Sequence, residues 1–116
     1  EIIETHHQQK LDAPSGTAIK TADLIEKARR STKNETHLEE LFQGARGAKV
    51  SNTNIHSLRL PGYLASQQVM FGSMGENLTI SHNSISRDCF MPGVLLACNK
   101  VLEINHLIYG LENLLD

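Results

Sequence analysis

The sequence predicts an α+β fold, in which one mixed or antiparallel sheet of about four strands carries helices on one face. Three strand-like runs follow one another without a helix between them, at residues 55–60, 65–72 and 77–85. An unbroken run of strands favours antiparallel or mixed pairing over a doubly wound parallel sheet. Stretches with helical periodicity lie before and after these strands, at residues 16–30 and 92–109.

The first elements along the chain are predicted to be a strand, a loop and a helix. Residues 1–6 contain two adjacent isoleucines and no turn residues, which is typical of a strand. The loop over 7–15 ends in Asp-Ala-Pro-Ser, and Ser15 is a suitable N-cap for the helix over 16–30. Three apolar residues line one face of this helix: Ala18, Ala22 and Ile25.

The second half of the chain carries the strands and a C-terminal helix. The polar segment 31–54 is expected to contain a short helix around 37–43 and then a Gly-Ala-Arg-Gly loop. The helix that begins at Pro92 is apolar on most sides, which predicts burial on more than one side. The strand over 77–85 gives the sheet one mixed, uncharged face, which is compatible with another subunit or with solvent.

Composition excludes several classes of protein. With 116 residues, 40% of them hydrophobic and 21% charged, the chain is predicted to form one soluble domain over 1–116. A net charge of −2 argues against a nucleic-acid partner. No apolar run has the length of a membrane span, and no secretion signal opens the chain, so we expect a cytoplasmic protein. In that compartment Cys89 and Cys98 are expected to be free, buried thiols.

Reactive groups are concentrated in the run THHQQKLDAPSGTA, residues 5–18. His6 and His7 can exchange protons near neutral pH, and Lys10 adds a positive charge. Pro-Ser-Gly-Thr at 14–17 leads into a helix, whose first turn offers free backbone N–H groups and the positive end of the helix dipole. The run therefore predicts a site that binds a carboxylate or a phosphate and transfers a proton.

Each of these features also has a purely structural explanation. Ser15-Gly16-Thr17 suits a helix cap, the histidine pair suits a solvent-facing strand end, and Lys10 suits an ordinary surface position. Only the conjunction within one run favours a site. Other site types do not match: the sequence contains no Walker A motif, no G-x-S-x-G elbow, and no histidine or cysteine spacing that is typical of zinc, so no metal is expected.

The run from residue 1 to residue 18 resembles the signature E-x-x-x-x-H-H-x-x-K-x-D-x-P-S-G-T-A of the 4-hydroxy-tetrahydrodipicolinate reductase family, and it matches without a gap. A second block agrees in order: Arg59, V-M-F-G at 69–72, Gly75-Glu76, L-T-I-S-H at 78–82, Arg87 and F-M-P-G-V at 90–94. The resemblance covers nearly the whole chain and is weakest over 31–54.

This resemblance implies roles for individual residues. His6 matches the histidine that serves as a general acid/base, Lys10 matches the proton donor to the substrate, and His7 matches a substrate-binding histidine. The substrate that the resemblance implies is a cyclic dicarboxylate. A second set of matches concerns its binding: Gly16 and Thr17 correspond to the pair that holds a substrate carboxylate, with Ser15 and Arg87 as further substrate-binding positions.

The resemblance also implies an organisation larger than this chain. Family members have an N-terminal dinucleotide-binding domain for NADH or NADPH, followed by a domain for substrate binding and tetramer contacts. This sequence contains no G-x-G-x-x-G loop and does not begin with Met, so we expect a substrate-binding and tetramerisation domain excised at the domain junction. Alone it is expected to be inactive in NAD(P)H-dependent reduction, a step of lysine and diaminopimelate biosynthesis. Two alternatives stay open: a stand-alone dicarboxylate- or phosphate-binding module, and an assembly domain whose site is vestigial.

Overall fold

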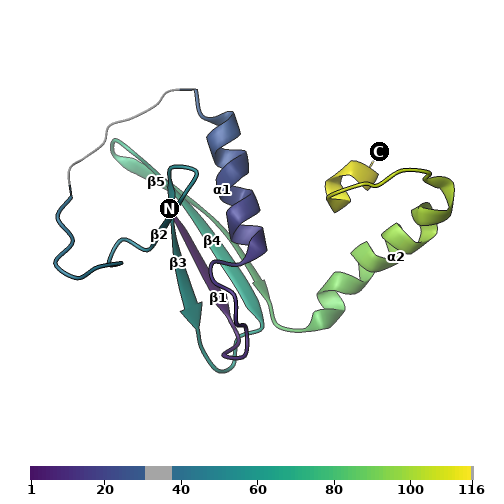
Figure 1. Ribbon diagram of the computed structural model, residues 1–116, viewed down its shortest axis with the longest axis horizontal. Coiled ribbons are helices and arrows are strands. Elements are labelled where there is room, and N and C mark those ends of the chain that lie inside the picture. The colour runs from purple at the N-terminus through teal and green to yellow at the C-terminus, as the bar shows by residue number, and fades with distance from the viewer. Residues whose placement is uncertain (31–37, 116) are drawn as a thin grey trace. The chain divides into compact units, whose positions relative to one another are not determined.

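The computed structural model describes residues 1–30 and 38–115, and the chain divides into two units (Figure 1). The first unit is Glu1–Ile85, and the second begins at Ser86. The first unit contains the whole sheet and helix α1, while the second contains α2 and short 3₁₀ turns. Within the described residues, no helix combines the length and the apolar character that crossing a membrane requires.

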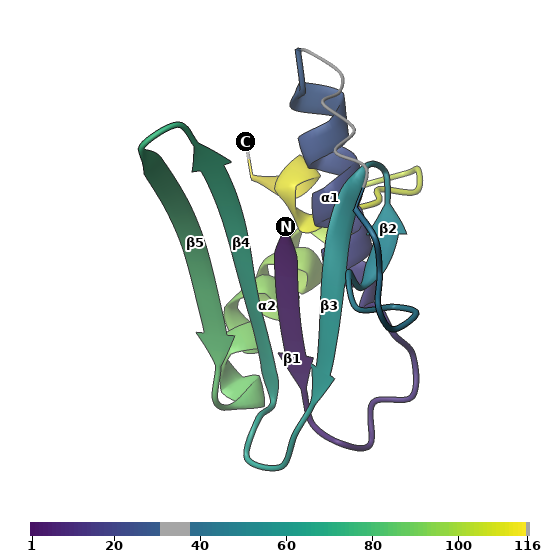
Figure 2. The same cartoon turned by 90° about the vertical axis from the view of Figure 1, so that its left-hand side faces the viewer.

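The sheet of the first unit has five strands in the order β2-β3-β1-β4-β5 (Figure 2). β1 pairs with β3 in parallel, and every other pair is antiparallel, so the predicted α+β class with a mixed sheet is confirmed. The expected number of strands was one too low, because β2 has only three residues. The strand bounds are Ile2–His6 for β1, Ala48–Val50 for β2, Thr53–Arg59 for β3, Ala65–Ser73 for β4 and Glu76–Ser84 for β5.

Strand β2 exists because a tight turn joins it to β3. Ser51 and Asn52 both have positive φ, 46° and 60°, as a two-residue type I′ hairpin turn requires. Both side chains bond to α1: Ser51 Oγ donates to Asp23, and Asn52 Nδ2 donates to Glu26 Oε1 at 2.9 Å. The turn is therefore attached to the helix, a tertiary contact that the local sequence pattern does not reveal.

Helix α1, Gly16–Ala28, covers one face of the sheet (Figure 1). The buried apolar core lies between them and consists of Ile2, Ala18, Ala22, Ile55 and Val69. Two alanines on the inner face let the helix approach the strands closely, because their side chains are short. The predicted helix over 16–30 is thus confirmed apart from its last residues.

Strand alternation places the polar residues of the site on the same face as this core. Ile2 is buried against α1, so Glu4 and His6 face the same side of β1. The register pairs Ile2 with Ile55 and His6 with Arg59, which brings Arg59 to that face as well. One end of the helix-covered face is therefore apolar and the other end is polar.

The second unit differs from the prediction in three respects. Helix α2 is Met91–Lys100, followed by a 3₁₀ turn, and Ile104 is already extended with φ −106° and ψ 130°, so the helix does not reach residue 109. None of its residues is buried, because its neighbours within the unit are short 3₁₀ turns that cannot cover an apolar helix. For the same reason Cys89 and Cys98, which are free as predicted, are exposed rather than buried.

Two other expectations concern the region before β2 and the number of domains. Residues 38–43 are not helical, and Glu40 instead accepts bonds from the backbone N–H groups of Gly44 and Arg46 at 3.2 and 2.8 Å. Residue 37, which the expected short helix included, lies outside the described residues. The assignment of 1–116 as one domain stays a prediction.

Candidate functional site

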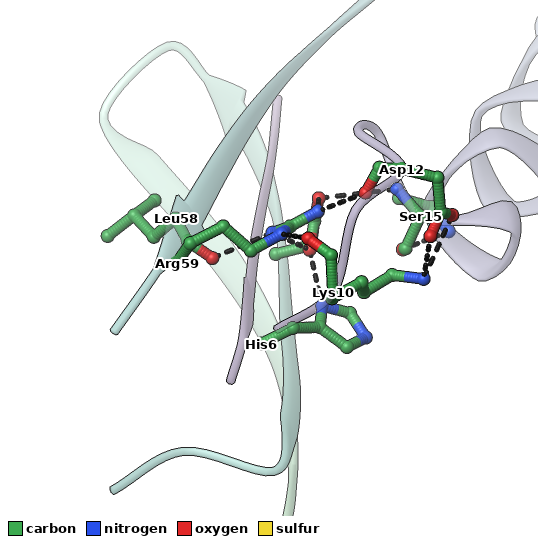
Figure 3. A network of polar contacts seen from close by, with 8 residues as sticks. His6, Lys10, Asp12, Ser15, Leu58 and Arg59 are labelled. Carbon is green, nitrogen blue, oxygen red and sulfur yellow. Dashed lines mark hydrogen bonds and ion pairs between the residues drawn. The ribbon is translucent and has the colours of Figure 1, made fainter. Parts of the chain in front are cut away.

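A network of polar contacts lies beside the end of β1 (Figure 3), and its hydrogen bonds converge on one buried carboxylate. Glu4 has no solvent exposure. Its Oε2 accepts from His6 Nδ1 at 2.5 Å and from Arg59 Nη1 at 3.0 Å. Its Oε1 accepts from Arg59 Nη2 at 2.9 Å and from the backbone N–H of Ser15 at 3.2 Å. The two oxygens of one side chain thus contact strand β1, strand β3 and the start of helix α1.

The environment of Glu4 favours its ionised form. Burial raises the pKa of the Glu4 carboxyl, but its hydrogen bonds, the one from Arg59 first among them, outweigh burial and hold the pKa below the usual 4.5. The guanidinium of Arg59 donates hydrogen bonds to both carboxylate oxygens of Glu4. Such a bidentate ion pair is stronger than a single hydrogen bond. At neutral pH the network therefore contains a buried, paired negative charge.

Arg59 also holds the loop that carries Lys10. Its Nε donates to the carbonyl of Lys10 at 3.3 Å, and its Nη2 donates to the carbonyl of Asp12 at 2.7 Å. The Lys10 ammonium in turn contacts both carboxylate oxygens of Asp12, at 2.7 and 2.9 Å, and this bond lowers the pKa of Asp12. Figure 3 shows the side chain of Lys10 pointing toward Asp12 and the guanidinium of Arg59 pointing toward the loop.

The beginning of helix α1 is capped by a side chain, and its first residues are accessible to a ligand. Ser15 is buried, and its hydroxyl accepts from the backbone N–H of Ala18 at 3.3 Å, so the predicted N-cap is confirmed. Gly16 and Thr17 follow it and are exposed. A Cβ placed on Gly16 would meet no atom within 4 Å, which leaves room for a group to approach the first helical residues. An anion can approach the positive end of the helix dipole there.

The structure brings most of the predicted site residues into one region. Hydrogen bonds through Glu4 and Arg59 join the imidazole of His6, the backbone carbonyl of Lys10 and the backbone N–H of Ser15. Gly16 and Thr17 follow Ser15 directly. His7 lies on the adjoining loop, where its Nδ1 is 3.2 Å from Gln9 Oε1. Arg87 belongs to the second unit, in the 3₁₀ turn Arg87–Phe90, and its substrate-binding role stays a prediction.

Sequence reasoning assigned no role to Glu4 or Arg59, although both carry the network. A usable signal was present in the strand pattern. Glu4 lies two residues from the buried Ile2, and Arg59 lies four residues from the buried Ile55, so both charged residues occupy positions of core parity. A charged residue at such a position requires a partner, because an unpaired buried charge is strongly unfavourable.

The fold and the site together define an α+β domain in which a buried carboxylate joins a histidine at the end of β1 to the open start of helix α1. Among the described residues, no group of three or more histidine, cysteine or acidic side chains is placed to hold a metal ion. A family model described as "Dihydrodipicolinate reductase, C-terminus" matches residues 1–115. The chain belongs to this family.

Individual relatives agree with that assignment. The chain is 65% identical over 115 residues to the 4-hydroxy-tetrahydrodipicolinate reductase of Legionella pneumophila strain Philadelphia 1, covering 99% of this chain and 47% of the relative. It is 54% identical to the enzyme of the same name from Bacillus thuringiensis, covering 44% of it. A solved structure, dipicolinate-bound dihydrodipicolinate reductase from Paenisporosarcina sp. TG-14, superposes with a TM-score of 0.83 at 52% identity, covering 99% of this chain and 44% of that one. The chain thus spans less than half the length of these relatives.

Proposed function

We propose that this chain is the substrate-binding and proton-transferring domain of a 4-hydroxy-tetrahydrodipicolinate reductase that works in the cytoplasm in lysine and diaminopimelate biosynthesis. The observation that carries the proposal is the single network in which His6, Lys10 and the start of α1 are joined through Glu4 and Arg59. The dipicolinate bound to the solved relative supports a cyclic dicarboxylate as the ligand class. The alternatives are a dicarboxylate-binding module without redox activity and a vestigial assembly domain.

Different residues of this chain would bind the substrate and transfer the proton. The N–H groups at Gly16 and Thr17, with the Thr17 hydroxyl, hold one substrate carboxylate at the positive end of α1. Lys10 and His7 lie on the adjoining loop, where they can contact the polar groups of the ring. Conversion of 4-hydroxy-tetrahydrodipicolinate to tetrahydrodipicolinate adds one hydride and one proton and releases water. Lys10 or His6 supplies the proton.

The hydride would come from NADH or NADPH, which supplies it when bound. This sequence has no G-x-G-x-x-G fingerprint, so its own residues do not fit the usual dinucleotide site. We therefore assign nucleotide binding to the part of the relatives that this chain does not cover.

Calorimetric titration of pyridine-2,6-dicarboxylate into this chain tests the binding half of the proposal. We expect saturable binding, weakened roughly ten- to a hundredfold by Lys10→Ala, because a hydrogen bond to a charged group contributes about 1.5–3 kcal/mol. Lys49→Ala is the matched control, since Lys49 is an exposed lysine on β2, outside the network. Equal affinity of all three proteins would contradict the role of Lys10. Absence of binding by every protein would contradict a site formed by this chain alone.

A homotetramer, built sheet against sheet, is the assembly that we propose. The face of β4 and β5 opposite the core carries uncharged side chains: Gln68, Met70, Thr79, Ser81 and Asn83. Light scattering at high micromolar concentration should give the mass of four chains, and Ser81→Arg should reduce it, because that arginine would place like charges across the interface. A monodisperse monomer for the unsubstituted chain would refute this assembly.

A further inference from the structure

We propose that Glu4 is a positioning residue that keeps the proton of neutral His6 on Nδ1, so that Nε2 is the nitrogen that exchanges protons with a ligand, and that the same carboxylate ties His6 to the start of α1. The inference rests on the proposed function of His6. It adds two residues, Glu4 and Arg59, which hold other residues of the site in position.

The contact between Glu4 and His6 carries the first part of the inference. An ionised carboxylate can only accept hydrogen bonds, so the nitrogen that lies 2.5 Å from its Oε2 must be the one that bears hydrogen. In a neutral imidazole the other nitrogen, Nε2, is then an acceptor. A buried carboxylate that selects the tautomer and orientation of a histidine is a recurring arrangement in acid/base catalysis.

Arg59 makes this arrangement rigid. From strand β3, Arg59 donates hydrogen bonds to both oxygens of Glu4, and its side chain is only 19% exposed. With two guanidinium bonds in place, the carboxylate cannot rotate away from His6 without breaking them. The same guanidinium bonds the carbonyls of Lys10 and Asp12, so the loop that carries the second proton-transfer group is attached to the same support.

The second oxygen of Glu4, Oε1, also contacts the start of α1 and so links the histidine to the proposed anion-binding position. Oε1 accepts from the backbone N–H of Ser15, the residue that caps α1. Because Oε1 and Oε2 belong to one planar group, the separation between His6 and the helix start is set by a single buried side chain. A ligand carboxylate held at Gly16 and Thr17 is therefore presented at a constant distance from the imidazole.

Glu4→Gln gives a sharp expectation for the tautomer. The amide oxygen is favoured on the side of Ser15 and Arg59 Nη2, because the reverse orientation would place the amide NH₂ against both of these fixed donors, whereas this one places it against a single fixed donor, Arg59 Nη1. The amide NH₂ then faces His6 Nδ1, which must accept instead of donate, so the proton of the neutral ring moves to Nε2. Glu76→Gln is the control of equal charge, since Glu76 is exposed at the start of β5.

The test is a long-range ¹H–¹⁵N correlation spectrum of the chain labelled with ¹⁵N-histidine, recorded with the imidazole of His6 neutral. We expect the Nδ1–H tautomer of His6 in the unsubstituted chain and in Glu76→Gln, and the Nε2–H tautomer in Glu4→Gln. An Nε2–H tautomer in the unsubstituted chain would overturn the proposal. So would a folded Glu4→Gln protein that keeps the proton on Nδ1. If Glu4→Gln does not fold, the unsubstituted spectrum alone decides.

Titration of the same samples with pyridine-2,6-dicarboxylate separates this inference from the proposed function. Binding together with an unexpected tautomer would refute the role of Glu4 and leave the dicarboxylate site in place. The expected tautomers without binding would confirm the positioning role and contradict the dicarboxylate site.

Discussion

Arg59→Ala is expected to lower the free energy of unfolding by about 3–5 kcal/mol, which is the usual cost of removing one partner of a buried ion pair. The substitution leaves Glu4, which has no solvent exposure, without the guanidinium that contacts both of its oxygens. It also removes the bonds to the carbonyls of Lys10 and Asp12. Urea unfolding followed by circular dichroism measures the change.

Arg46→Ala is the matched control for this prediction. Arg46 also pairs with a glutamate, Glu1, but both side chains are well exposed, at 44% and 37%. Exposed ion pairs contribute about 1 kcal/mol or less, so the control should stay close to the unsubstituted chain. Equal changes in the free energy of unfolding for the two substitutions would show that the buried pair stabilises this fold no more than the exposed pair does.

The pH dependence of the Arg59→Ala effect follows from the ionisation of Glu4. The pKa of Glu4 is lowered in the folded chain, so its contribution to stability is complete above the unfolded value of 4.5 and is lost as the pH falls through the folded value. Without Arg59, the buried carboxyl can take up a proton and become neutral at low pH. The difference in stability between the two proteins should therefore shrink from neutral pH toward pH 4.5 and below. A constant difference would argue against Glu4 as its source.

His6→Ala is expected to lower kcat by about 10²- to 10⁴-fold, the range that is typical of a proton-transfer group. The measurement uses a chimera in which this chain replaces the matching 115 residues of the Legionella pneumophila relative, to which it is 65% identical. NADPH or NADH consumption with 4-hydroxy-tetrahydrodipicolinate then reports turnover. Since His6 is proposed to act on the proton and not to bind the carboxylate, KM should change much less than kcat.

His56→Ala is the control for the chimera. His56 lies on β3 but at the opposite parity from Ile55 and Arg59, so it faces away from the network, and its Nε2 is 2.8 Å from Glu1. Its removal should leave kcat unchanged. Turnover by the His6→Ala chimera at the level of the control would refute the acid/base role, and a change confined to KM would reassign His6 to substrate binding.

Features that depend on neighbouring residues were predictable from the sequence. The N-cap at Ser15 and the cluster of His6, Lys10 and Gly16 lie within residues 5–18, and the inner face of α1 follows directly, so their chemistry can be judged without the fold. The three longer strands, β3, β4 and β5, follow from alternation and turn residues in the same way. The α+β class follows in turn from the order of these local elements.

Features that depend on distant residues required the tertiary structure. Glu4 and Arg59 are 55 residues apart in the chain, and only the parallel register of β1 with β3 brings them together. Strand β2 is too short for a periodic signal and depends on a turn that bonds to α1. The apolar pattern of α2 predicted burial, yet the elements of its own unit are too small to cover it.

The range of the interactions explains which features the sequence predicts and which require the tertiary structure. Helix caps, turns and strand alternation are decided by interactions over a few residues, so the sequence by itself determined the fold class and the position of the reactive run. The partner of a buried charge and the tautomer of a histidine are decided by whichever side chain the register places opposite. Only the tertiary structure could therefore show that a single carboxylate supports both the imidazole and the start of the helix.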